Sequence, residues 1–165
     1  MALKYEKILY CTDFSEDADY AFLNALDMAE KYQARLYIFH VLHSPYKYMR
    51  SIVDEQSQGG DEAFISQEVI ENSLKNLEDR YQPKMGGFKN YEFQVTAGVP
   101  FVEIVRFARA QNVDFIVLGA AGSSELDRIT FGSTAENVAR RAHCTVMAIR
   151  YPENTFQLDK IGKQV

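Results

Sequence analysis

The chain has 165 residues, of which 47% are hydrophobic and 25% charged, a composition that is typical of one globular domain and excludes disordered and fibrous classes. Its formal net charge of −5 excludes a protein that acts mainly by neutralising the phosphates of nucleic acid. Residues 83–165 nevertheless carry 10 bases against 8 acids, so a site for an anion is expected in this half.

Location and redox state follow from two further features. Cys11 and Cys144 each lie in an apolar run, so we expect reduced core cysteines, with a redox pair as the alternative. Residues 1–14 contain no secretory apolar stretch, and no run reaches the roughly 18 apolar residues that a membrane span requires. The sequence therefore predicts a cytoplasmic protein with neither a membrane nor a nucleic-acid partner.

A strand and a helix are predicted at the start of the chain. The apolar run Lys7–Thr12 predicts a buried strand. Ser15 is a candidate N-cap, since three carboxylates follow it in the first turn, where they suit the positive end of the helix dipole. The apolar residues that recur at helical spacing are Ala18, Ala21, Phe22, Ala25, Ala29 and Tyr32.

The next segment predicts a strand, a loop and a helix. Residues 34–42 are rich in β-forming side chains and predict a second buried strand. Residues 45–60 are polar without a sustained period, which predicts a long mobile loop. A second helix, closed by Pro83 and the glycines that follow, has one face marked by Ala63, Ile70, Leu74, Leu77 and Tyr81.

The second half of the chain continues the alternation. Residues 91–96 alternate as a half-buried edge strand does, and Pro100 suits the first turn of a helix that ends near Asn112. Residues 113–118 form an almost purely apolar run that predicts a strand and leads into Gly119.

The last elements complete the predicted fold. Ser133 opens a fourth helix, residues 144–149 predict the last strand, and residues 151–165 form a tail with little pattern. Five strands alternating with four helices predict a single α/β domain over residues 1–150, a doubly wound five-stranded parallel sheet with helices on both faces, because parallel neighbours need crossover connections.

Ligands of such sheets bind at the carboxyl ends of the strands, near the point where the strand order reverses. The candidate segments are therefore Thr12 and Asp13 after the first strand, residues 41–43 after the second, and the stretch that starts at Gly119.

This last stretch contains Gly119, Gly122 and, after nine residues, Gly132 and Ser133 at a helix start. Glycines allow a close approach of backbone to ligand, and the free N–H groups of a helix start bind anions, so phosphates would fit here. Ser133 and Glu136 also match a capping box, which needs no ligand. On spacing alone both interpretations stay open.

Together these segments resemble the universal stress protein family, in particular its ATP-binding subgroup, over about residues 4–150. The resemblance rests on residues 8–15, which read Ile-Leu-Tyr-Cys-Thr-Asp-Phe-Ser, on His40-Val41 and on Gly98-Val-Pro100. It rests most on residues 113–119 running into the family's Gly-x₂-Gly-x₉-Gly-Ser/Thr signature. The resemblance implies an adenine-nucleotide alpha-hydrolase-like fold.

The resemblance also implies a role for each matching residue. Asp13, next to Thr12, would hold the ribose of ATP, although an Asp at this place can also simply cap the following helix. Main chain at Val41 would meet the adenine. The phosphates, with Mg²⁺ or Mn²⁺, would lie on the backbone, the Ser133 hydroxyl and the Thr134 N–H at a cradle formed by Gly119, Gly122, Gly132, Ser133 and Thr134.

The chain departs from the family pattern beside this cradle. Ala120 and Ala121 stand where relatives often have polar or basic residues, and Ser123 stands where a basic residue is frequent. Because a basic side chain would form charge-assisted bonds to phosphate, these departures predict a lower affinity. Arg128 either compensates or is a solvated surface residue. In the last strand, Thr145 replaces a frequent proline.

The sequence favours binding over turnover. It contains no P-loop, dinucleotide fingerprint or nucleophile elbow, and its three histidines are too scattered to predict a metal site. We therefore expect a stress-response regulatory protein in which ATP biases the surface presented to an unknown partner protein. The alternatives are a slow ATP hydrolase and a dimeric interaction module without nucleotide. The apolar edge strand at residues 144–149 and the resemblance predict a homodimer through that strand.

Overall fold

The computed structural model describes residues 2–44, 65–121 and 131–152. The predicted loop at residues 45–60, Ala63, Gly122, Ser123, Arg128 and the tail from residue 153 lie outside them. The elements in chain order are β1 (Lys7–Thr12), α1 (Glu16–Tyr32), β2 (Arg35–His43), α2 (Gln67–Tyr81), a 3₁₀ turn (Gln82–Lys84), β3 (Tyr91–Gly98), α3 (Pro100–Gln111), β4 (Phe115–Gly119), α4 (Ser133–Arg141) and β5 (Thr145–Ile149).

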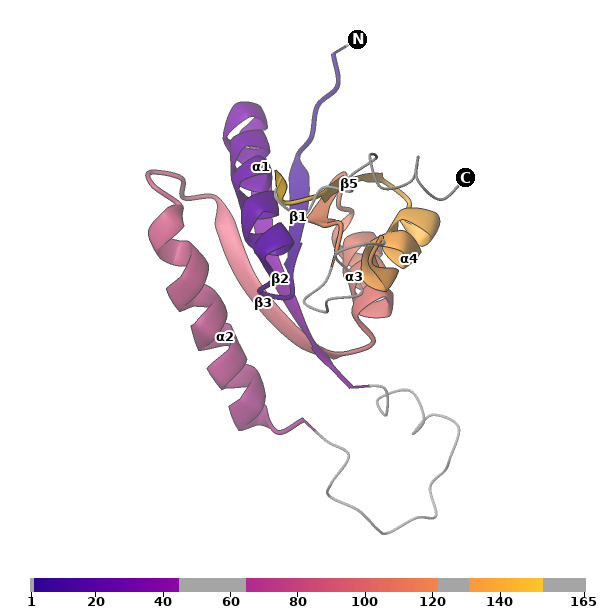
Figure 1. Cartoon of the computed structure of the whole chain (residues 1–165). Helices are drawn as coiled ribbons and strands as arrows, with labels where there is room; N and C mark the ends of the chain where they lie inside the picture. Colours follow the sequence, from indigo (N-terminus) through magenta and orange to yellow (C-terminus); the bar gives the residue numbers. More distant parts are fainter. Residues whose placement is uncertain (1, 45–64, 122–130, 153–165) are drawn as a thin grey trace, which may run out of the picture.

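The five strands form one parallel sheet in the order β3-β2-β1-β4-β5 (Figure 1). From β1 the chain first builds outward through β2 to β3, then crosses back and builds outward on the other side through β4 to β5. The strand order therefore reverses between β1 and β4, which makes their carboxyl ends the switch point where doubly wound folds bind ligands. The predicted fold class is confirmed, with β3 and β5 at the two edges.

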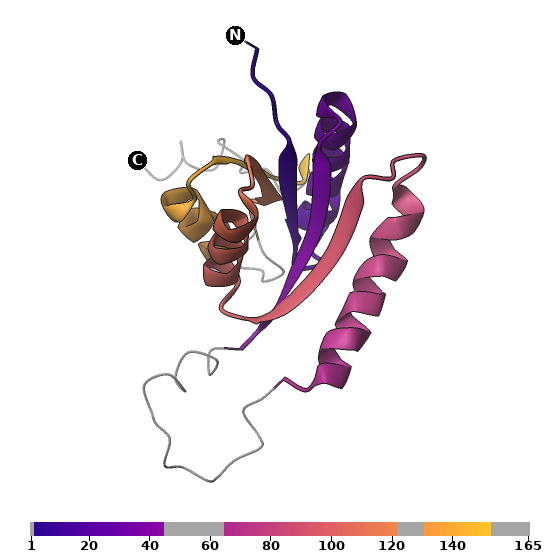
Figure 2. The same cartoon turned by 180° about the vertical axis from the view of Figure 1, so that it is seen from behind.

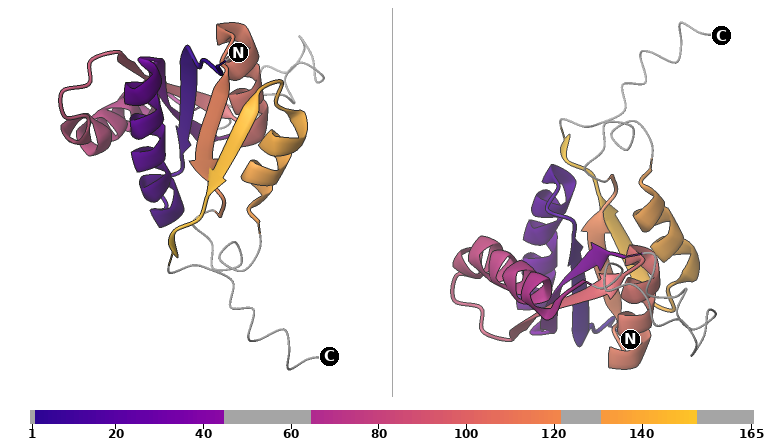
Figure 3. Two further views of the ribbon diagram at one scale, coloured as in Figure 1. Left: turned by 90° about the horizontal axis from the view of Figure 1, so that it is seen from above. Right: turned by 90° about the horizontal axis from the view of Figure 1, so that it is seen from below.

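Helices cover both faces of the sheet. The pair α1 and α2 lies on one face and the pair α3 and α4 on the other, as Figure 2 and the view from above in Figure 3 show. Side chains of β1 alternate between the two layers, with Ile8 and Tyr10 in the core under α1 and α2, and Leu9 and Cys11 in the core under α3 and α4. Each face therefore has its own apolar core.

Two strands begin later in the chain than their apolar runs predict. Residues 34–42 and 113–118 were the expected strands, whereas β2 and β4 start at Arg35 and Phe115. In both cases the first residue of the run bonds back to the end of the preceding helix. The Ala34 N–H donates to Ala29 O and the Val113 N–H to Ala108 O, each at 2.9 Å. These bonds satisfy terminal helix carbonyls, so the first apolar residue of each run serves the helix end.

The remaining differences are small. β3 continues to Gly98, two residues beyond its predicted end, and β5 starts at Thr145. Cys11 and Cys144 are free thiols; Cys11 is a core residue, as predicted, whereas Cys144 is only partly buried and precedes β5. No helix in the described part of the chain is long and apolar enough to cross a membrane; the cytoplasmic location stays a prediction.

Candidate functional site

A cavity of about 280 Å³ opens at the switch point, close to the lower end of the roughly 300–1,000 Å³ range of small-molecule sites. Its lining comes from the carboxyl ends of β1, β2 and β4, from the start of α3 and from the start of α4. All the predicted site residues in the described segments line it, namely Thr12, Asp13, Val41, Gly119, Gly132, Ser133 and Thr134. Gly122, the remaining predicted residue, lies outside the described residues.

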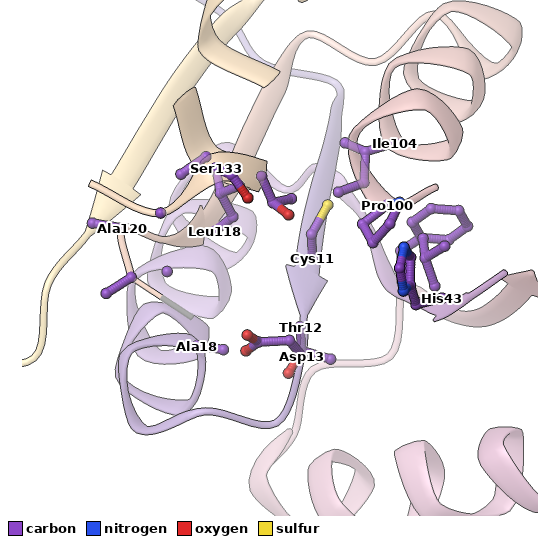
Figure 4. Close-up of a pocket in the computed structure, with 17 residues that line it drawn as sticks. Cys11, Thr12, Asp13, Ala18, His43, Pro100, Ile104, Leu118, Ala120 and Ser133 are labelled. Atoms are coloured by element: carbon purple, nitrogen blue, oxygen red, sulfur yellow. The ribbon is translucent and has the colours of Figure 1, made fainter. Parts of the chain in front are cut away.

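The cavity has two unlike walls (Figure 4). Ile104, Pro100 and His43 lie on one side of Cys11, whereas Ser133 and Ala120 lie on the other. The first wall is mostly apolar and is completed by Phe39 and Val41. The second wall consists largely of small residues, which include Gly119, Ala120, Gly132 and Ser133.

Sequence reasoning missed most of the apolar wall. Phe39, Pro100 and Ile104 line the cavity, yet from the sequence they are core and helix-start residues. Two signals existed, because His43 lies in the segment 41–43 that the strand-end rule selects and Pro100 belongs to the Gly98-Val-Pro100 motif. The apolar wall arises from packing α3 against β2 and β3, a long-range arrangement that no local pattern encodes.

The packing of β4 against α1 requires a glycine at position 119, whether or not a ligand binds there. A Cβ atom at this position would lie 2.8 Å from Ala18 N and 3.0 Å from the Asp17 carbonyl carbon and Cβ. The end of β4 therefore lies directly against the first turn of α1, and this close approach needs a glycine. The sequence interpretation of Gly119 as a phosphate-cradle glycine lacked this reason.

A buried carboxylate fixes the backbone that follows Gly119. Asp17 is 2% exposed, and its two oxygens accept hydrogen bonds from the Ala121 N–H at 3.1 Å and the Tyr151 N–H at 2.8 Å. The Ala120 N–H donates to Ile149 O at 2.7 Å. Ala120 and Ala121 are themselves buried and line the cavity. The two alanines that depart from the family pattern are therefore a closely packed part of its wall.

The start of α4 differs from the predicted capping box. Gly132 is the N-cap, with an extended backbone and no side-chain cap, so Ser133 is the first helical residue. The Ser133 side chain therefore does not occupy the cap position. The Glu136 carboxylate accepts a hydrogen bond from Arg140 at 2.8 Å. The capping-box interpretation is therefore wrong.

The N–H groups at this helix start divide into two kinds. The Gly132 N–H donates to Ala120 O at 2.7 Å, and the first helical bond runs from the Glu136 N–H to Gly132 O at 3.0 Å. The N–H groups of Ser133, Thr134 and Ala135 therefore have no carbonyl partner within α4. All three residues line the cavity. The Gly132 N–H is therefore already bonded, and the backbone donors that an anion at this helix start could use are those of the three residues after it.

The turn after β1 carries Thr12 and Asp13. Asp13 is exposed and lines the cavity, and its Oδ1 accepts from the Ser15 N–H at 3.0 Å. The Thr12 hydroxyl lies 2.7 Å from the Tyr81 hydroxyl and accepts from the Phe14 N–H at 3.0 Å. Thr12 therefore holds the turn, whereas the Asp13 carboxylate, which can accept about four hydrogen bonds, has capacity for a ligand.

Two further titratable groups lie at or beside the cavity. Burial, together with the nearby Cys144, raises the pKa of the Cys11 thiol well above its usual value, so this thiol stays protonated and is a poor nucleophile. The His40 Nδ1 donates to Thr12 O at 2.8 Å. No group of three His, Cys, Asp or Glu residues in the described part of the chain could hold a metal ion.

These features define an α/β protein of the doubly wound class with a ligand cavity at its switch point and a helix start open to that cavity. The family model described as the universal stress protein family matches residues 4–150. The chain therefore belongs to the universal stress protein family, a family of stress-response proteins.

Three relatives illustrate the match. Universal stress protein MJ0531 of Methanocaldococcus jannaschii is 32% identical over 152 residues, which cover 90% of this chain and 84% of that protein. Universal stress protein MJ0577 of the same organism is 31% identical over 160 residues, covering 91% and 98%. The solved structure of universal stress protein UspA from Lactobacillus plantarum superimposes with a TM-score of 0.66 at 24% identity, covering 90% of this chain and 100% of that one.

Proposed function

We propose that this chain binds ATP at the switch-point cavity and acts as a nucleotide-dependent regulatory protein in the stress response. The observation that carries the proposal is the helix start, where the N–H groups of Ser133 and Thr134 border a cavity whose opposite wall is apolar. A nucleotide has the same division, with charged phosphates at one end and a flat base at the other. The family resemblance of the sequence motifs supports the same ligand.

The orientation of the nucleotide follows from the two walls. The phosphates would meet the start of α4, where backbone N–H groups and the helix dipole favour negative charge. The base would lie against the wall formed by Phe39, Val41 and Ile104. The Asp13 carboxylate lies at the end of β1, between the two walls in the sheet order, where it would accept from the ribose hydroxyls.

A divalent cation fits this site only together with the phosphates. The described residues offer no cluster of three metal-ligating side chains, and Mg²⁺ commonly binds through substrate phosphates and few protein oxygens. Ser133 is the residue whose hydroxyl would join such a cation. The bound cation would supply neutralisation of phosphate charge.

We propose binding without appreciable turnover. Hydrolysis requires a group that orients and deprotonates water near the terminal phosphate. Among the described residues, the ionisable side chains that line the cavity are Cys11, Asp13 and His43. Cys11 is a buried, protonated thiol, Asp13 is assigned to the ribose, and His43 lies on the apolar wall. A slow hydrolase is the outcome to test by separating ADP and phosphate from ATP after incubation with Mg²⁺.

Ser133→Pro tests the proposed phosphate contact. Gly132 has φ −60° and ψ 144°, the conformation that a residue before proline favours, and Ser133 occupies the first helical position, where proline is well tolerated. The substitution therefore removes the Ser133 N–H and hydroxyl while preserving α4. Ser133→Ala is the matched control, because it removes the hydroxyl and keeps the N–H.

Calorimetric titration with ATP and Mg²⁺ gives the measurement. A hydrogen bond to a charged group contributes about 1.5–3 kcal/mol, so Ser133→Pro should weaken ATP binding roughly tenfold to 150-fold. The loss for Ser133→Ala should be smaller. Equal affinity of Ser133→Pro and the wild-type chain, with both folded, would contradict the proposed phosphate site. No ATP binding by the wild-type chain would leave the interaction module as the better description.

We propose further that the protein is a homodimer through β5. This strand lies at the edge of the sheet and carries the half-buried apolar side chains Val146, Met147 and Ile149. An open apolar edge favours pairing, and a two-fold arrangement would close it. Sedimentation equilibrium should give twice the chain mass for the wild-type protein and a lower mass for Met147→Lys. A monomeric wild-type protein would refute the dimer.

A further inference from the structure

The turn that carries Asp13 is held in an uncommon conformation. Phe14 has φ +64°, in the left-handed region that non-glycine residues rarely occupy. Within the turn, the Phe14 N–H donates to Thr12 Oγ1 and the Ser15 N–H donates to Asp13 Oδ1, each at 3.0 Å. Such a conformation persists only where surrounding groups hold it. The residues that contact this turn therefore help to fix the position of the Asp13 carboxylate.

The last turn of α2 supplies the first of these neighbours. Tyr81 is fully buried, and its hydroxyl donates to Asp19 Oδ1 at 2.8 Å. Because the Asp19 carboxylate only accepts, the single proton of the Tyr81 hydroxyl is committed to it. The contact of 2.7 Å between Tyr81 and Thr12 is then donated by Thr12. The direction of the chain of bonds is therefore fixed from Thr12 to Tyr81 to Asp19.

Arg80 provides a second contact to the same turn. Its guanidinium forms an ion pair with Asp19, and its Nη2 also donates to Phe14 O at 3.3 Å. The guanidinium carbon lies 5.6 Å from the centre of the Phe14 ring, within the range of a cation–π interaction. Arg80 thus contacts both the backbone and the ring of the residue that follows Asp13.

We propose that Tyr81 and Arg80 are positioning residues for Asp13, through which α2 sets the affinity of the cavity for a nucleotide. Neither side chain is among the residues that line the cavity, so both act through the turn at residues 12–15. The inference rests on the proposed function, because it assigns the ribose contact to Asp13. Supporting side chains that lock a binding group reduce the ordering cost of ligand binding.

A pair of matched substitutions tests the proposal. Tyr10 and Tyr81 are both fully buried, and the Tyr10 hydroxyl lies 2.6 Å from Ala18 O and 3.0 Å from the Tyr81 hydroxyl, whereas the hydrogen bond to Asp19 is made by Tyr81. Tyr81→Phe should weaken ATP binding roughly threefold to tenfold, the range expected for one hydrogen bond. Tyr10→Phe should leave the affinity for ATP within twofold. It should lower the free energy of unfolding by about as much as Tyr81→Phe does.

A double-mutant cycle separates positioning from a general structural effect. In an Asp13→Ala background, Tyr81→Phe should no longer change the affinity for ATP, although it should still lower the unfolding midpoint. Arg80→Lys, at a partly exposed site, should weaken ATP binding in the same Asp13-dependent way.

Three results would overturn the proposal. They are an unchanged affinity in Tyr81→Phe, equal losses in Tyr81→Phe and Tyr10→Phe, and a loss that persists without the Asp13 carboxylate. Failure of the wild-type chain to bind ATP would instead refute the proposed function, and this inference with it.

Discussion

Gly119→Ala is the substitution for which the structure makes the sharpest prediction of stability. A Cβ atom at this position would lie 2.8 Å from Ala18 N and 3.0 Å from two atoms of Asp17. Two of these three atoms belong to the backbone of α1, which cannot rotate away as the end of a flexible side chain would. The added methyl group must therefore push the first turn of α1 away from the end of β4.

The magnitude follows from overpacking and from the bonds of Asp17. Inserting a methyl group into a tightly packed site costs about 1–3 kcal/mol. Moving α1 also lengthens the hydrogen bonds from the Ala121 and Tyr151 N–H groups to the buried Asp17 carboxylate, at 3.1 and 2.8 Å. We expect Gly119→Ala to lower the free energy of unfolding by about 2–3 kcal/mol, or roughly 4–12 °C in Tm for a chain of this size.

Two other glycines provide controls for the urea-unfolding assay. A Cβ atom at Gly87 would meet nothing within 4 Å, so Gly87→Ala should be neutral or stabilise the fold by up to about 1 kcal/mol. Gly86 is equally open but has φ +58°, so Gly86→Ala should cost about 1–2 kcal/mol of backbone strain alone. If Gly119→Ala unfolds at the same urea concentration as Gly87→Ala, the reasoning from close packing is refuted.

Two further predictions concern ionisable groups. Burial opposes ionisation of Asp19, but hydrogen bonds from Arg80 and Tyr81 outweigh it and lower the pKa of this carboxyl. The carboxylate therefore stabilises the fold above the unfolded pKa of about 3.9, and this contribution disappears as pH falls through the lower folded value. Wild type and Asp19→Asn should differ by about 1 kcal/mol in urea at neutral pH and converge in acid; a difference independent of pH would contradict this. Burial also raises the pKa of both thiols, and only Cys144 is half-buried rather than buried. Iodoacetamide should therefore label Cys144 first in the native protein, and comparable labelling of Cys11, measured by peptide mass spectrometry, would show that the floor of the cavity is open.

Local patterns predicted most of the fold because the residues that define each helix or strand lie within a short stretch of sequence. The apolar run of β1, the helical spacing after it and the N-cap at Ser15 are all found, the last with its hydroxyl accepting from the Ala18 N–H at 3.2 Å. The errors at Ala34 and Val113 are also local in extent. They arise because an apolar residue after a helix serves the helix end as readily as it starts a strand.

The site was predicted less completely because it depends on contacts between distant segments. Thr12 was chosen for its place at a strand end, yet its hydroxyl is engaged by Tyr81, 69 residues away. Tyr81 itself was predicted only as an apolar position on the second helix. The shift of the cap from Ser133 to Gly132 likewise depends on the bond from the Gly132 N–H to Ala120 O, which no spacing rule contains.

A crystal structure of the protein grown with ATP and Mg²⁺ tests the central proposal most directly. We expect phosphate density within hydrogen-bonding distance of the Ser133 and Thr134 N–H groups, a ribose at the Asp13 carboxylate and a base against Val41 and Ile104. Phosphates that lie away from the start of α4, or a cavity without nucleotide at saturating ATP, would contradict the proposal that this chain is an ATP-binding regulator.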